Sequence, residues 1–178
     1  MAFDTQTKTD VIEQLQAKFL EMSLFAEGVE EKVLFEKIPG KWNMAQQIDH
    51  LTIANTVTAI GFNMPKPALK TIFGTSNRNS FSYDEIVFRY QSKLTAGAKA
   101  SFAFQPKLSI LPRKKLLLSL WNHSVDSLVK AAKKWEEEDL DSFQLNHPIM
   151  GKITMREMLY FTIYHIGHHL QTMQALVK

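Results

Sequence analysis

Apolar residues recur at steps of three and four along most of this chain, the spacing that places them on one face of an α-helix. Between about Asp4 and Gly28 the repeat consists of Val11, Leu15, Phe19, Met22 and Ala26. After Pro112 it consists of Leu117, Trp121, Val125, Leu128, Ala132 and Trp135. The pattern predicts two long helices, each with one apolar face turned toward a core.

Three further helices are predicted from their first residues. A Ser, Thr or Asn followed three residues later by Glu or Gln is typical of a helix N-terminus, because each side chain can bond the backbone N–H of the other. The pairs are Asn43 with Gln46, Ser82 with Glu85, and Thr154 with Glu157. They predict helices that begin after residues 43, 82 and 154, the last of which runs to the C-terminus.

The segments between these helices are predicted from their turn residues and charges. Residues 63–81 are rich in Asn, Ser, Gly and Pro and are expected to form a loop. The helix that begins after Ser82 is expected to end between Gly97 and Ser101. The acidic run at 136–139 opposes the dipole of a helix C-terminus, so the preceding helix is expected to fray or stop there.

The composition supports one all-α domain spanning residues 1–178. Apolar types make up 45% of the chain and charged types 22%, as in ordinary globular proteins. A chain of 178 residues buries enough surface for one core of its own. Seven glycines and six prolines are few for an all-β fold, which needs many turns.

The sequence contains no cysteine, which excludes a disulfide scaffold, a thiolate metal site and a cysteine nucleophile. The first residues are polar, and no apolar run approaches the length of about 18 residues that a membrane span requires. We therefore expect a cytoplasmic protein with no membrane partner.

The formal net charge of +3 is a weak basis for a nucleic-acid partner. The basic residues Lys107, Arg113, Lys114 and Lys115 form a short cluster without interleaved aromatic residues, at the start of a predicted helix. A solvated helix start explains this cluster better than a nucleic-acid site. No nucleic-acid partner is expected.

Three of the six histidines lie inside the last predicted helix, in a stretch of five residues: His165, His168 and His169. Positions four apart share a helix face, so His165 and His169 could hold one metal ion. Ile166 stands where zinc-protease helices have their catalytic Glu, which excludes that class. His168 lies nearer the flank and is a less obvious ligand. The alternative is that the histidines are ordinary hydrogen-bonded residues of the core.

A third ligand must come from elsewhere, and His50 is the natural candidate. It lies in the second helix, on the inward side beside Leu51 and Ala54. Considered alone, His50 is better explained as a hydrogen-bonded histidine in the core or at its edge. Asp49, its neighbour, is expected to be solvated, and His147 before Pro148 is expected to serve a turn.

Two motifs resemble the DinB-like family. The run from Lys41 to Leu51, with Trp42, Asn43 and the His50-Leu51 pair, is similar to the second-helix signature of that family. The run from His147 through Thr154 and Glu157 to His165-x-x-His168-His169 is similar to its last helix. One position departs from the family pattern: Thr172 stands where the family usually has Gln, which leaves open what supports the last histidine.

The resemblance implies a four-helix bundle made by the first, second, fourth and fifth helices. A long crossover, carrying the extra helix at 82–101, would join the second and third core helices in parallel. The resemblance also implies a divalent metal ion, foremost zinc or nickel, held by His50, His165 and His169. Relatives include transferases and isomerases that use low-molecular-weight thiols, and hydrolase activity is often suggested.

Three neutral imidazoles leave a divalent ion with open positions for a water or a thiolate. We therefore expect a metal-dependent enzyme, either a thiol-dependent transferase or a hydrolase, acting on a small molecule. Any thiol must come from a cosubstrate, because the chain has no cysteine. The alternative is a non-enzymatic helical bundle for binding or stress response, with an incidental metal or none. A homodimer is compatible with a long bundle surface.

Overall fold

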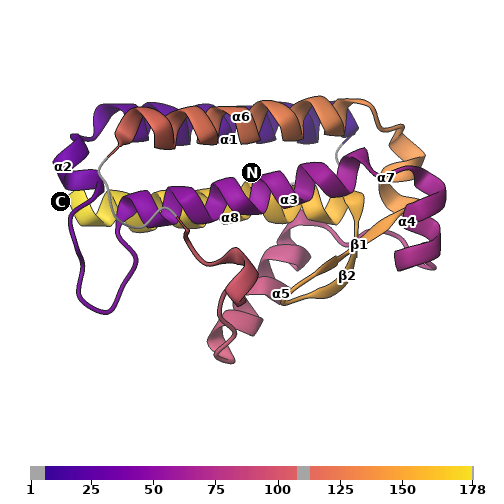
Figure 1. Cartoon of the computed structure of the whole chain (residues 1–178). Coiled ribbons are helices and arrows are strands. Elements are labelled where there is room, and N and C mark those ends of the chain that lie inside the picture. The colour runs from indigo at the N-terminus through magenta and orange to yellow at the C-terminus, as the bar shows by residue number, and fades with distance from the viewer. Residues whose placement is uncertain (1–6, 108–112, 178) are drawn as a thin grey trace.

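The structure is a computed structural model that describes residues 7–107 and 113–177. Its main body consists of four long helices that lie side by side (Figure 1). They are α1 (Lys8–Gly28), α3 (Met44–Asn63), α6 (Lys114–Lys133) and α8 (Met155–Val177). The prediction of an all-α four-helix bundle is confirmed, and these are the four core helices that it named.

Hydrogen bonds at the helix ends fix the chain directions. The Trp135 indole N–H, just beyond α6, donates to the Phe62 carbonyl at the end of α3 (2.9 Å), so α3 and α6 end together and run parallel. The Lys114 ammonium group donates to the Glu27 carbonyl (2.7 Å), so α6 begins where α1 ends. Parallel neighbours need a long return, which Figure 1 shows passing beside α3 and α8.

That crossover carries α4 (Lys66–Phe73), α5 (Tyr83–Thr95) and the short 3₁₀ helix η1 (Phe102–Phe104). The predicted extra helix after Ser82 is therefore confirmed as α5. The prediction that residues 63–81 form one loop was wrong, because α4 lies within this range. Pro65 and Pro67 begin this helix rather than break it, since proline is tolerated in a first helical turn.

The predicted helix starts are confirmed. Asn43 with Gln46 and Ser82 with Glu85 form reciprocal capping boxes. Thr154 and Glu157 do the same at α8, with the Thr154 N–H donating to the Glu157 carboxylate at 2.8 Å. The expected start of the first helix near Asp4 lies outside the described residues. A further box, Thr7 with Asp10, begins α1.

The acidic run plays a different part from the one expected. The helix before it ends at Lys133, and the run begins the short helix α7 (Glu137–Ser142), where acidic residues favour the helix dipole. An antiparallel hairpin follows, made of β1 (Gln144–His147) and β2 (Gly151–Thr154), which was not predicted. It places His147 beside the bundle.

The core lies between the four long helices and includes Trp121 of α6, a large and fully buried side chain. Its ring packs edge-to-face on Phe19 of α1, with ring centres 5.6 Å apart. Its indole N–H donates to the Ser23 hydroxyl (2.8 Å), so burial leaves no polar group unpaired there. Among the described residues, no helix is both long and apolar enough to cross a membrane.

Candidate metal centre

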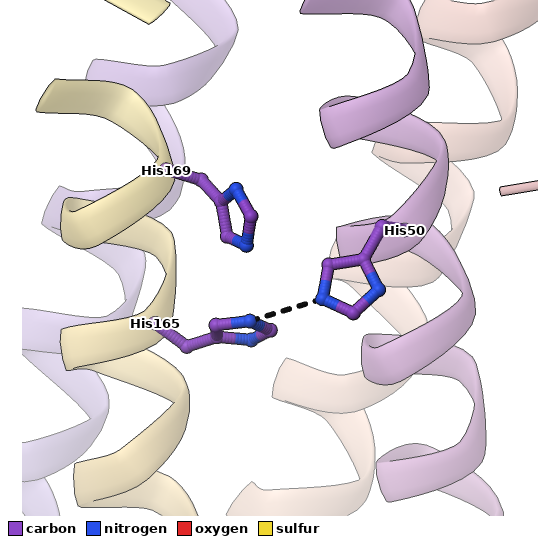
Figure 2. Close-up of side chains that lie close together, drawn as sticks. All are labelled: His50, His165 and His169. Atoms are coloured by element: carbon purple, nitrogen blue, oxygen red, sulfur yellow. Dashed lines mark hydrogen bonds between the residues drawn. The ribbon is translucent and has the colours of Figure 1, made fainter. Parts of the chain in front are cut away.

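Three histidines converge between α3 and α8 (Figure 2). His50 points inward from α3, and His165 and His169 point toward it from successive turns of α8. One ring nitrogen from each lies within 4.8 Å of the others. The Nε2 atoms of His50 and His165 are 3.1 Å apart. The structure thus brings together all three residues that the sequence named.

The crossover holds the His50 ring through a hydrogen bond on the side away from the other two histidines. Its Nδ1–H donates to the Phe104 carbonyl (2.6 Å), and since a carbonyl only accepts, the proton resides on Nδ1. The Nε2 lone pair therefore faces the other two histidines. In metal-binding histidines, a carbonyl that accepts from the ring nitrogen turned away from the metal sets the tautomer in this way. Sequence reasoning missed Phe104, because a backbone carbonyl leaves no signal in the residue type.

Asp49 strengthens the same attachment. Its carboxylate accepts from the Lys107 backbone N–H, which ties the end of the η1 segment to α3. The residue is buried, with 4% of its surface exposed. The expectation of a solvated Asp49 was therefore wrong, because the crossover covers this side of α3.

His169 is held by Gln47, which lies one turn before His50. The His169 Nδ1–H donates to the Gln47 side-chain oxygen at 3.0 Å, which leaves Nε2 of His169 free to face the other two rings. The Gln47 amide N–H donates to the Trp42 carbonyl (3.4 Å), so both ends of the amide are used. Thr172 instead donates to the His168 carbonyl of its own helix. Gln47 thus supplies the support that the sequence left open.

The three imidazoles are neutral near pH 7. Burial lowers the pKa of His50, and it lowers the pKa of His169 to about 3 with a smaller contribution from His50 and His168. Burial likewise places the pKa of His165 well below its usual value, with the neighbouring histidines adding to the effect. Neutral imidazoles carry the lone pairs that divalent transition metals bind, so this group could hold a metal ion.

Two cavities border the histidines. The smaller, of about 250 Å³, is mostly apolar, with Val57, Phe73, Leu145 and Phe161 in its walls and His50 and His165 at its end. The larger is a wide cleft of about 1070 Å³ that reaches His50 and His169 and has Lys41 and Lys99 in its walls. His50 and Tyr90 border both cavities. The histidine group is therefore accessible from two cavities and is not closed off.

The other candidate residues lie apart from this centre. His168 stacks on Tyr164, with ring centres 6.0 Å apart, and does not belong to the group that can share one ion. His123 and Asp126 are exposed on α6. His147 does serve a turn, as expected, because its Nδ1 accepts from the backbone N–H groups of Ile149 and Met150. It also lines the apolar cavity.

Solved structures with the same fold give this arrangement a context. The crystal structure of TT2238, a four-helix bundle protein, is 16% identical, with a TM-score of 0.60 over 95% of this chain and 99% of that chain. The crystal structure of the colibactin self-resistance protein ClbS in complex with a dsDNA is also 16% identical, with a TM-score of 0.60 over 97% and 96%. No curated protein matches this chain.

The ClbS complex corrects one expectation. A nucleic-acid partner was not expected for this chain, yet a protein of the same fold is crystallised with dsDNA. That expectation relied on the small net charge of +3 and on the shortness of the one basic cluster considered. Net charge averages over the whole surface, whereas contact with DNA depends on where the basic side chains lie. The fold therefore does not exclude a nucleic-acid partner.

The family resemblance is confirmed over nearly the whole chain. The sequence pattern of the DinB superfamily matches residues 12–173, which include both histidine motifs, all of α3 and α6, and most of α1 and α8. The matched bundle fold and the histidine group agree with that assignment. The chain belongs to the DinB superfamily.

Proposed function

We propose that this protein is a metal-dependent enzyme acting on small molecules, with a divalent ion held by His50, His165 and His169. The supporting observation is that three neutral imidazoles, with ring nitrogens within 4.8 Å of one another, border two cavities. Zinc and nickel are the first ions to test, since both accept imidazole ligands. When bound, the ion supplies a positive charge that lowers the pKa of a thiol or water beside it.

The two cavities favour transfer between two substrates over hydrolysis. The apolar cavity suits an electrophile with an apolar body. The wide cleft, with the exposed ammonium groups of Lys41 and Lys99, suits a polar, anionic thiol cosubstrate. In the transfer the sulfur bonds to the electrophilic carbon, the leaving group departs with its bonding electron pair, and the thiol proton passes to solvent. Hydrolysis has one organic substrate and water, so it would leave one of the two cavities without an organic molecule.

Nucleic-acid contact at the wide cleft is a second candidate function. Lys41 and Lys99 are exposed and line a cleft large enough to admit part of a macromolecule. Fluorescence anisotropy of a labelled DNA duplex tests it at low and high salt. Binding that weakens with salt and is reduced in the Lys41→Ala/Lys99→Ala protein supports this candidate. Binding that the double substitution leaves unchanged counts against it.

Elemental analysis of tag-free protein tests the leading proposal. We expect about one divalent ion per chain, lost in the His50→Ala, His165→Ala and His169→Ala proteins, as for a site with three protein ligands. His168→Ala and His123→Ala are matched controls that should retain the ion. A parent protein that takes up neither zinc nor nickel would refute the proposal and leave the non-enzymatic bundle as the better description.

Activity is tested second, on protein of known metal content. Low-molecular-weight thiols are combined with aryl halides, and halide release is measured together with the thioether formed. Turnover that needs the thiol, the ion and His165 supports a transferase. Product formation without a thiol indicates a hydrolase instead.

A further inference from the structure

His147 lies at the end of β1, in the wall of the apolar cavity, outside the histidine group. Its Nδ1 accepts hydrogen bonds from two backbone N–H groups, of Ile149 at 3.2 Å and of Met150 at 3.1 Å. A backbone N–H only donates, so Nδ1 carries the lone pair and the ring proton resides on Nε2. The turn of the hairpin thus fixes His147 as a donor through Nε2.

The donor faces the cavity. Within the described part of the chain, Nε2 of His147 has no hydrogen-bond partner. Every fully buried side-chain nitrogen or oxygen in that part of the chain does have a partner. Nε2 is therefore not fully buried and remains accessible. His147 keeps only 6% of its surface exposed, and the cavity is the space that it lines.

Neighbouring rings hold this orientation. Phe161 packs edge-to-face on His147 with ring centres 4.3 Å apart, and Tyr90 approaches at 6.3 Å. Phe161 also stacks on His165 of the histidine group, with ring centres 4.9 Å apart. A single ring therefore separates the donor of His147 from the histidine group.

We propose that the Nε2–H of His147 anchors the substrate in the apolar cavity by donating a hydrogen bond to one acceptor oxygen. An apolar cavity of about 150 Å³ holds a benzene molecule. The cavity here, about 250 Å³, therefore fits a substituted single ring, and an aryl ketone combines such a ring with one acceptor oxygen. The assignment of this molecule as a substrate rests on the proposed function, whereas its binding does not require the ion.

A matched pair of variants distinguishes the anchoring role of Nε2 from the structural role of Nδ1 in the hairpin turn. In His147→Asn the short amide retains an acceptor near the position of Nδ1 and removes the donor into the cavity. In His147→Gln the longer amide places a donor near the position of Nε2 and removes the turn acceptor. A purely structural role predicts the larger effect for Gln, whereas anchoring predicts the larger effect for Asn.

Binding of acetophenone and of ethylbenzene, which lacks the oxygen, is measured by NMR titration on the full-length protein, as purified and after chelator treatment. We expect acetophenone to bind the parent more tightly, and His147→Asn to weaken it about three- to tenfold, the worth of one hydrogen bond. Ethylbenzene binding should be unchanged, and His147→Gln should retain most of the preference for the ketone.

Equal affinity of the parent for the two compounds overturns the inference, as does an equal loss of both in His147→Asn or a failure of acetophenone to bind. The outcome is separable from that of the proposed function. A protein that prefers the ketone but holds no ion refutes only the metal-dependent function. A protein that holds the ion without this preference refutes only the anchor.

Discussion

Gln47 and His169 join α3 to α8 through a hydrogen bond of 3.0 Å between the side-chain oxygen of Gln47 and Nδ1 of His169. Gln47 is buried and lies one turn before His50, so one helix supplies both a proposed metal ligand and the support of another. The bond sets the tautomer in which Nε2 of His169 faces the other two rings.

Replacing Gln47 should therefore weaken metal binding without removing a ligand. We expect Gln47→Ala to lower zinc affinity about 10- to 100-fold, the usual effect of losing a hydrogen bond behind a metal-binding histidine. Competition with a chromophoric chelator measures it. Gln47→Glu, which retains an acceptor, should recover most of the affinity. Gln174→Ala is the control, since Gln174 is exposed on α8, and equal losses in the two alanine variants would contradict the interpretation.

The buried histidines should make the metal-free protein sensitive to acid. Burial lowers the pKa of His147 to about 4 in the folded state, whereas an exposed histidine titrates near 6.5. Between these values the unfolded chain binds the extra proton, so the free energy of unfolding falls as the pH falls. The contribution of His147 is fully present above about pH 6.5 and declines by about 1.4 kcal/mol per pH unit below it.

Urea unfolding of chelator-treated protein at several pH values between 7 and 5 checks this dependence. His147→Asn should show a shallower fall than the parent, because it removes one of the titrating groups. Identical slopes in the two proteins would show that His147 titrates normally in the folded state.

Glu157 attaches the crossover to the start of α8. Its carboxylate is fully buried and accepts from both terminal nitrogens of Arg78, at 2.5 and 3.0 Å, and from the Phe81 N–H at 2.6 Å. Arg78→Ala should lower the free energy of unfolding by about 2 kcal/mol, less than for a fully buried pair because the Arg78 side chain is 35% exposed. Thermal and urea unfolding measure the change.

Arg89 offers a matched control for that substitution. The guanidinium groups of Arg78 and Arg89 both lie over the Phe81 ring, 3.8 and 3.7 Å from its centre. Arg89 is exposed, however, and within the described part of the chain it makes no hydrogen bond or ion pair with Glu157. Arg89→Ala should reduce stability by about 0.5–1 kcal/mol, the value of an exposed cation–π contact. A loss equal to that of Arg78→Ala would locate the effect in the ring contact instead of the buried carboxylate.

Asp49 should hold the end of the crossover against the bundle. Its carboxylate accepts from the Lys107 N–H, next to the segment that positions His50. In Asp49→Ala we expect tryptic cleavage after Lys99 and Lys107 to become about tenfold faster, since a lost bond to a charged group favours local opening. Mass spectrometry follows the cleavage. Asp126→Ala, at an exposed position of α6, should cleave at the parent rate.

Features set by a few neighbouring residues could be predicted from the sequence. The capping pairs Asn43–Gln46, Ser82–Glu85 and Thr154–Glu157 begin α3, α5 and α8 because both partners lie within one helical turn. The common face of His165 and His169 follows from the same local geometry. His50, on a different helix, was a candidate because of its inward position in the predicted second helix, and the family resemblance then placed it in the ligand set.

Tertiary structure decided the rest, because it depends on segments that meet only after packing. His50 and His165 are 115 residues apart in sequence, and no local pattern encodes the 3.1 Å between their nitrogens. The burial of Asp49 and the bond from His50 to the Phe104 carbonyl both require the crossover to cover α3. The sequence by itself determined the four long helices, α5 and the residue types of the centre. Packing decided which backbone and side-chain groups surround them, since burial and hydrogen-bond partners are properties of the assembled bundle.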